Sequence, residues 1–183
     1  LAPKTPATDP AGNGRFFFGR GTGWNGEETP MVGGDFDPRW TQAREAVAAL
    51  KELWTRDKAE FHGRYYDFPP FYCYPKPAQK PHPPILLGGN APNVLQRVAR
   101  WGDGWLPNRV TPGRIEEGRK ILDTLAAERG RHPASLSISV FGQPPETTRQ
   151  QVDDFLNAGA IRVSVWPTHC ETAQDKLGTA AAR

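Results

Sequence analysis

The stretch that decides the fold is PILLGGNAPNVLQRVARWGDGWLP, residues 84–107. It opens with an apolar run that ends in two glycines, a pattern that predicts a buried strand followed by a tight turn. Residues 90–101 then carry apolar side chains at helical spacing, and a second short apolar run follows at 102–107. A strand, a helix and a strand in this order form the unit from which parallel sheets are built.

The rest of the chain repeats this alternation. Further strands are predicted at 15–18, 136–141 and 161–166, and helices at 35–55, 111–130 and 147–158. Such an alternation predicts an α/β fold with a parallel sheet and right-handed crossovers. Five strands in 183 residues approach the spacing of a TIM-barrel-like (β/α)8 fold. An open doubly wound sheet is the competing architecture.

Helix boundaries can also be proposed from the sequence. Asp37 and Pro38 fit the cap and first position of the helix at 35–55, and Thr111 with Pro112 fits the start of the helix at 111–130. Residues 1–14 are rich in Pro and Gly, which predicts an irregular or weakly helical segment.

Residues 56–84 interrupt the alternation with many prolines and aromatic residues. Proline disfavours both helices and central strands. We therefore expect an insertion loop here, packed on the body of the domain through its Phe and Tyr side chains.

Composition narrows the classes of protein to consider. Hydrophobic residues make up 37% of the chain, charged residues 23%, and the net charge is +3. No block of five or six like charges supports nucleic-acid binding, and no apolar run approaches the ~18 residues of a membrane span. Cys73 and Cys170 lack metal or redox spacing, and we expect two free thiols in a cytoplasmic protein rather than a disulfide.

Two loops combine residues suited to a ligand. Residues 21–28 follow the first strand with glycines, Thr22 and Trp24. This mixture suits a planar cofactor with polar edges, although a plain strand-to-loop turn with a packing Trp explains it as well. Residues 88–93 place Gly88 and Gly89 directly before a helix, where backbone N–H groups and the helix dipole favour an anion such as a phosphate. Two glycines before a helix are also common without a ligand, and the Gly-x-Gly-x-x-Gly fingerprint is absent.

Other chemistry has less support. Asp103, between two glycines, is either a turn residue or an acid, and the turn is favoured. The four His residues stand apart from one another and from other ligand types, so no metal site is predicted. We expect His62 in a surface turn. No Gly-x-Ser-x-Gly elbow of a serine hydrolase is present.

Taken in order, several motifs resemble the bacterial luciferase-like monooxygenase family, most closely its coenzyme F-420-dependent oxidoreductase branch. They are the segments 14–28, 61–63, 66–68, 83–89 and 102–105. The motifs cover about residues 12–110, and the similarity is looser beyond them.

The resemblance implies a TIM-barrel-like fold with the cofactor across the carboxyl ends of its strands. It assigns Thr22, Gly23 and Glu27 to the ring system of the cofactor, and Gly88, Gly89 and Ala91 to its phosphate-bearing tail. The implied cofactor is coenzyme F-420, with FMN as the alternative. Trp24 stands where the sugar-phosphate dehydrogenase branch has Glu, which argues against that substrate class.

On this mapping, residues 1–183 are a single luciferase-like domain that is truncated at its amino terminus and holds about the last five β/α units. The implied activity is hydride transfer between F-420 and a small organic substrate; the alternatives are an FMN-dependent monooxygenase or a non-catalytic barrel fragment that needs a partner. We expect the fragment alone to be inactive and a homodimer to be feasible. The resemblance assigns no catalytic acid or base, and it names no substrate.

Overall fold

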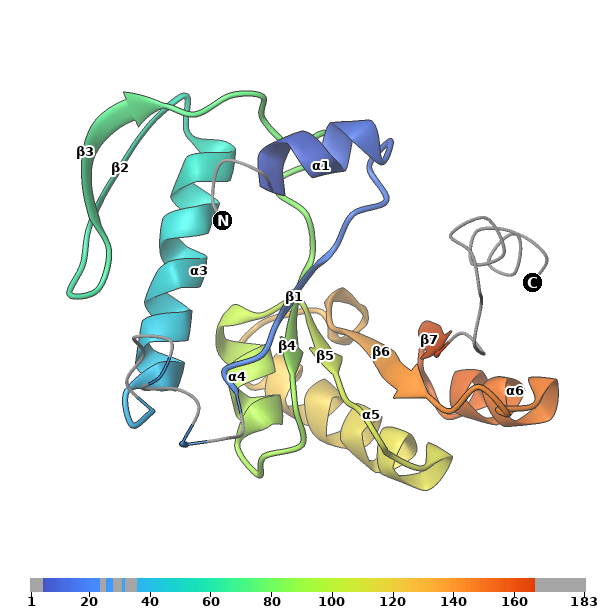
Figure 1. The fold of residues 1–183 in the computed structure, drawn as a ribbon. Helices are drawn as coiled ribbons and strands as arrows, with labels where there is room; N and C mark the ends of the chain where they lie inside the picture. The colour runs from blue at the N-terminus through green and yellow to red at the C-terminus, as the bar shows by residue number, and fades with distance from the viewer. Residues whose placement is uncertain (1–4, 24–25, 28–30, 32–35, 167–183) are drawn as a thin grey trace. The chain divides into compact units, whose positions relative to one another are not determined.

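The computed structural model describes residues 5–23, 26–27, 31 and 36–166 (Figure 1). The chain divides into two compact units, residues 1–87 and 88–183, with the boundary inside one strand. Outside one hairpin at residues 58–72, strands and helices alternate among the described residues. Apart from this antiparallel hairpin, the strand pairs of each unit are parallel. The predicted α/β fold with a parallel sheet is therefore confirmed.

In the first unit, β1 (Phe18–Arg20) pairs in parallel with β4 (Ile85–Gly88). Phe18 lies opposite Ile85 in this register. Residues 85–87 are fully buried, which explains the uninterrupted apolar run in the sequence. The strand predicted at 15–18 is shifted toward the carboxyl end, because only residues 18–20 pair with β4.

The amino-terminal segment forms a short helix, α1 (Thr5–Ala11), where an irregular or weakly helical segment was expected. Pro10 lies in its last turn, and the helix ends one residue later. The backbone then reverses through Asn13 (φ 51°) and Gly14 (φ 71°). The Gly14 N–H donates to the Asp9 carbonyl over 2.9 Å, a bond typical of a helix end.

Helix α3 (Arg39–Thr55) supplies most of the apolar side chains of the first unit. Its buried residues follow the predicted helical spacing and are Ala43, Val47, Ala49, Leu53 and Trp54. The Trp54 ring stands edge-on to Phe18 of β1, with 6.0 Å between ring centroids. The helix begins one residue later than predicted, since Pro38 occupies the cap position without a side-chain hydrogen bond.

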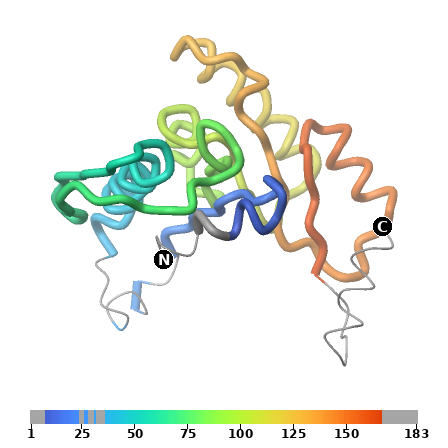
Figure 2. The backbone as a smooth tube through the Cα atoms, turned by 90° about the horizontal axis from the view of Figure 1, so that it is seen from above, coloured from blue at the N-terminus to red at the C-terminus, as the bar shows by residue number. Residues whose placement is uncertain are grey.

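The segment 56–84 contains an antiparallel hairpin, β2 (Lys58–His62) and β3 (Asp67–Tyr72), where an insertion loop was predicted. Figures 1 and 2 both show this hairpin beside α3. Pro69 and Pro70 fit into β3 because they lie where the register of the hairpin shifts, between the pairs Ala59–Phe71 and Phe61–Phe68, and because the other edge of the strand has no partner. Residues 73–84 contain neither helix nor strand.

Glu45 of α3 holds the turn of the hairpin. Its Oε1 accepts hydrogen bonds from the backbone N–H groups of Tyr65 (2.5 Å) and Tyr66 (2.8 Å). Burial on its own raises the pKa of Glu45, but these N–H groups outweigh it and leave the pKa below its ordinary value. A charged carboxylate therefore links the helix to the hairpin.

In the second unit, β5 (Gly104–Leu106), β6 (Ser137–Gln143) and β7 (Arg162–Val165) are parallel neighbours in that order. The helices are α4 (Val94–Trp101), α5 (Pro112–Ala127) and α6 (Arg149–Asn157). A 3-10 turn, η1 (Pro133–Ser135), precedes β6. The core of this unit includes Trp105, Ile115, Leu122 and Ile138, all completely buried.

Side-chain caps fix the starts of two of these helices. Thr111 accepts a hydrogen bond from the Arg114 N–H and Pro112 follows it, as predicted. Thr148 and Gln151 form a reciprocal capping box at α6.

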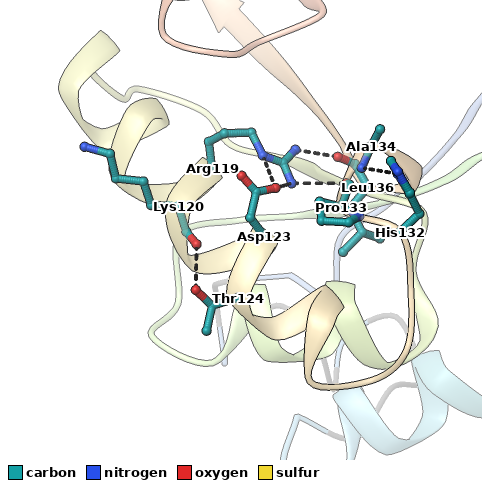
Figure 3. A network of polar contacts seen from close by, with 8 residues as sticks. All are labelled: Arg119, Lys120, Asp123, Thr124, His132, Pro133, Ala134 and Leu136. Atoms are coloured by element: carbon teal, nitrogen blue, oxygen red, sulfur yellow. Dashed lines mark hydrogen bonds and ion pairs between the residues drawn. The ribbon is translucent and has the colours of Figure 1, made fainter.

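Arg119 joins α5 to the entry of β6 (Figure 3). Its guanidinium donates to the Asp123 carboxylate within the helix and to the carbonyls of Leu136 and Pro133 outside it. Arg131 acts similarly at α4, because it donates to the carbonyls of Ala99 (3.1 Å) and Gly102 (2.9 Å). These two arginines fix where β5 and β6 begin.

Candidate functional site

The loop after β4 has the geometry of an anion site. Gly89 adopts φ +102°, a conformation that residues with a side chain rarely adopt. A Cβ built on Gly89 meets no other atom within 4 Å, so the backbone there faces open space. Helix α4 begins five residues later, and its cap residue Asn93 makes no side-chain cap bond. Its first turn presents N–H groups that have no acceptor within the helix.

This loop is tied to the end of β5. The Gly89 N–H donates to the Leu106 carbonyl over 3.3 Å, and the Trp105 Nε1–H donates to the Gly89 carbonyl over 2.8 Å. The Asn90 amide donates to the carbonyl of Asn108 at 2.7 Å. Both polar groups of the Gly89 backbone are therefore held by one neighbouring strand.

Within the second unit, the carboxyl ends of the parallel strands β5, β6 and β7 form one edge of the sheet, and the loop after β4 is tied to this edge through β5. The Phe141 N–H donates to the Pro107 carbonyl over 2.8 Å. The rings of Phe141 and Trp166 stand edge to face at 5.5 Å, and they are 44% and 53% exposed. This edge thus presents two aromatic rings in addition to the loop after β4.

The other predicted cofactor residues belong to the first unit. Thr22 and Gly23 lie two and three residues after the end of β1; Thr22 is half-buried, and Gly23 turns the chain with φ +80°. Glu27 lies exposed in a turn. Trp24, Asn25 and Glu28 lie outside the described residues. The structure thus brings Gly88, Gly89 and Ala91 together in one unit and places Thr22, Gly23 and Glu27 in the other.

The chain enters β1 beside a buried carboxylate. Asp9 is completely buried, and it accepts hydrogen bonds from the backbone and side-chain amides of Gln79. The same Gln79 side chain donates to the Phe16 carbonyl over 2.6 Å, two residues before β1. Burial raises the pKa of Asp9, yet its hydrogen bonds outweigh that effect and hold the pKa below its ordinary value of 3.8.

Asp103 serves as a turn residue, the role that the sequence favoured. It precedes β5, at the amino end of the strand, whereas the candidate ligand loops follow the carboxyl ends. Its carboxylate lies 3.7 Å from the Arg131 guanidinium. The strand predicted at 102–107 is shorter than expected, because it starts only at Gly104 and leaves Asp103 in front of it.

Histidines and cysteines form no centre in the part of the chain that the structure describes. His62 ends β2 and its Nδ1 lies 2.7 Å from the exposed carboxylate of Asp67. Cys73 is a free thiol, while Cys170 and His169 lie outside the described residues. Among the described residues, no group of three or more potential ligands is placed to hold a metal ion. Over the same residues, no helix has both the length and the apolar character needed to span a membrane.

Five residues of this edge were not predicted, namely Asn90, Asn108, Phe141, Trp166 and Trp105 in its role as a hydrogen-bond donor. Asn90 directly follows the glycine pair, and Asn108 follows the end of β5. Their positions after strand ends were visible in the sequence, but their mutual contacts depend on the pairing of the loops.

Comparison with known proteins places this chain in one family. The sequence profile of the family described as luciferase-like monooxygenase matches residues 8–160. An uncharacterised protein of Mycobacterium tuberculosis is 34% identical over 155 residues, which cover 81% of this chain and 53% of that protein. The FMNH2-dependent dimethylsulfone monooxygenase of Pseudomonas putida is 32% identical, covering 77% of this chain and 40% of that enzyme. The F-420-dependent hydroxymycolic acid dehydrogenase of M. tuberculosis is 30% identical, covering 81% and 42%.

Solved structures agree on the fold. An F-420-dependent secondary alcohol dehydrogenase superposes with a TM-score of 0.73 at 16% identity, covering 90% of this chain and 67% of that chain. The monooxygenase RslO1 of Streptomyces bottropensis superposes with a TM-score of 0.65 at 22% identity, covering 87% and 52%. The parallel α/β arrangement thus matches TIM-barrel structures over about half their length or somewhat more. The chain spans about half the length of the first of its curated relatives.

Proposed function

Because the chain belongs to the luciferase-like monooxygenase family, we propose that it holds the cofactor of an oxidoreductase that transfers hydride between coenzyme F-420 and a small organic substrate. The observation that carries this proposal is the loop after β4, where Gly89 with φ +102° opens onto free space five residues before a helix begins. Relatives that use F-420 and relatives that use FMNH2 both match this chain. FMN-dependent monooxygenation is therefore the second candidate.

The residues present fit a phosphate at this loop. A Cβ at position 89 would project into the open space, so the glycine leaves room for a group lying against the backbone. We propose that Gly88, Gly89 and Ala91 line the phosphate site of either cofactor, with donors other than the Gly89 N–H, which the Leu106 carbonyl accepts. The partial positive charge at the start of α4 favours the anion.

We further propose that Thr22, Gly23 and Glu27 contact the ring system. Gly23, with φ +80°, allows the backbone to approach a flat ring closely, and Thr22 offers a hydroxyl group to its polar edge. The cofactor supplies the redox chemistry when it is bound, by accepting or giving a hydride at its central ring. The protein binds the tail, orients the ring and provides the surface against which a substrate is held.

The exposed rings of Phe141 and Trp166 suit an organic substrate with an apolar part. They lie at the carboxyl ends of β6 and β7, on the edge where TIM-barrel enzymes bind ligands. We therefore include an apolar or aromatic group in the substrate class of the proposed reaction.

Fluorescence titration tests the proposal and separates the two cofactors. The purified chain is titrated with F-420 and with FMN, in oxidised and reduced forms. We expect binding of at least one cofactor with a Kd below about 100 μM, which corresponds to roughly 5.5 kcal/mol. A tenfold preference for F-420 supports hydride transfer to or from the deazaflavin, and a tenfold preference for reduced FMN supports the monooxygenase. Absence of binding to either contradicts both and favours a non-catalytic role.

A further inference from the structure

The indole of Trp105 connects the core of the second unit to the loop after β4. The side chain is completely buried. Its ring packs against Gly118 of α5 so closely that a Cβ at that position would lie 2.5 Å from the ring. The guanidinium carbon of Arg114 stands 5.3 Å from the centre of the ring. Trp105 therefore occupies a fixed position, and its Nε1–H donates to the Gly89 carbonyl over 2.8 Å.

This hydrogen bond sets the direction of a neighbouring donor. The peptide that carries the Gly89 carbonyl also carries the Asn90 N–H, and the bond is trans. In a planar trans peptide these two groups point in opposite directions. Because the indole holds the carbonyl, the N–H of Asn90 points away from Trp105 and from the core.

A second contact restricts the same peptide. The Asn90 side-chain amide donates to the Asn108 carbonyl over 2.7 Å and lies 3.2 Å from the Asn108 side-chain oxygen. The Gly89 N–H is held by Leu106. The loop is therefore fixed before any ligand arrives, which lowers the entropy lost on binding.

We propose that Trp105 is a positioning residue for the anionic tail of the cofactor, because it orients the Gly89–Asn90 peptide so that its N–H faces a phosphate. This inference rests on the proposed function, in which residues 88–91 receive the phosphate. It adds that the affinity for the phosphate depends on one buried donor, the Nε1–H of Trp105.

A residue that only fills the core affects all ligands alike. A positioning residue for the phosphate changes the affinity for phosphate-bearing ligands and leaves the affinity for their phosphate-free counterparts unchanged. FMN and riboflavin form such a pair, and F-420 and its phosphate-free deazaflavin chromophore form another. The ratio of affinities within a pair separates the two roles.

The experiment compares wild type with Trp105→Phe, which keeps an aromatic ring and removes the donor. We expect the affinity for FMN, or for F-420, to fall about fivefold to tenfold, the size of one hydrogen bond of ~1 kcal/mol. The affinity for riboflavin, or for the deazaflavin chromophore, stays within about twofold. The matched control is Trp54→Phe, since Trp54 is also buried and its Nε1 has no hydrogen-bond partner among the described residues. This control leaves both ratios unchanged.

An equal loss for both members of a pair in Trp105→Phe, or no loss, overturns the inference while the proposed function stands. If wild type binds no member of either pair, the proposed function fails and this inference fails with it. If Trp105→Phe does not fold, the residue is replaced by benzothienylalanine, in which sulfur takes the place of the indole N–H at nearly constant shape. The same change in the ratio is expected there. An unchanged ratio overturns the inference.

Discussion

The carboxylate of Asp9 accepts two hydrogen bonds from Gln79, which lies 70 positions further along the chain. One comes from the Gln79 backbone N–H at 2.9 Å and the other from its side-chain amide at 2.7 Å. The Gln79 amide also donates to the Phe16 carbonyl. A buried charge thus anchors α1 and the approach to β1 on the segment that leads into β4.

Substitution Asp9→Asn should destabilise the protein, because an amide group then faces the donors of Gln79. We expect a loss of about 1–3 kcal/mol in the free energy of unfolding at pH 7, measured by urea denaturation. A loss below about 0.5 kcal/mol would show that the anchor does not contribute to stability.

The same carboxylate should make stability depend on pH. The pKa of Asp9 is lower in the folded protein than its ordinary value of 3.8. The unfolded chain therefore binds the proton more readily, and the stabilisation is present above about pH 4 and lost as the pH falls through the folded pKa. Urea denaturation between about pH 5 and pH 2 should show a smaller fall in stability for Asp9→Asn than for wild type. Parallel curves would contradict the prediction.

Two glycines of α5 should respond oppositely to alanine. A Cβ on Gly118 would press on the Trp105 ring, whereas a Cβ on Gly113 meets nothing within 4 Å. We expect Gly118→Ala to cost about 1–3 kcal/mol through overpacking. Gly113→Ala, in the first turn of the same helix, should be neutral or stabilising by up to about 1 kcal/mol. Equal effects in thermal denaturation would show that the contact between Trp105 and Gly118 is not tight.

Neighbouring cations on α5 offer a second matched pair. Arg119 donates to carbonyls outside its helix and is one-fifth exposed, while Lys120 pairs with Glu116 on the exposed surface. Arg119→Ala should lower the free energy of unfolding by about 1–3 kcal/mol, because two part-buried carbonyl groups lose their donor. Lys120→Ala should change it by less than about 0.5 kcal/mol. Similar losses in urea denaturation would refute the anchoring role of Arg119.

The conformation of Gly89 should matter for the cofactor. Gly89 (φ +102°) and Gly130 (φ +65°) both have free space where a Cβ would stand. Each change to alanine should cost about 1–3 kcal/mol of stability through backbone strain alone. Only Gly89→Ala should weaken binding of FMN or F-420, by about tenfold, in a fluorescence titration. An equal effect of Gly130→Ala on binding would remove the special role of the loop after β4.

Much of the fold follows from periodicity in the sequence. The apolar run at 85–87 identifies β4, because a strand that is buried on both faces has no polar positions. The helical spacing of apolar residues identifies α3, because only one side of the helix is buried. The Pro-rich hairpin was not predicted, since proline argues against strands in general, although the free edge and the register shift of a two-stranded sheet accept it.

The candidate site was predictable only in part. Glycines after strand ends, such as Gly23 and Gly89, stand out because positive φ requires them. The contacts of Trp105 with Gly89 and of Asn90 with Asn108 join residues 16 and 18 positions apart, and no local pattern encodes them. Asp103 was included in the strand predicted at 102–107 because a strand of three residues leaves little signal for its boundaries.

The most direct test of the central claim is a map of amide chemical shifts. The isotopically labelled chain is titrated with F-420 and, separately, with FMN, and the backbone amide of every assigned residue is followed. We predict that the largest changes fall on the loop after β4, at Gly88, Gly89 and Ala91, and on Thr22 and Gly23 after β1. Changes elsewhere with these loops silent, or no changes with either cofactor, would contradict cofactor binding at these two loops.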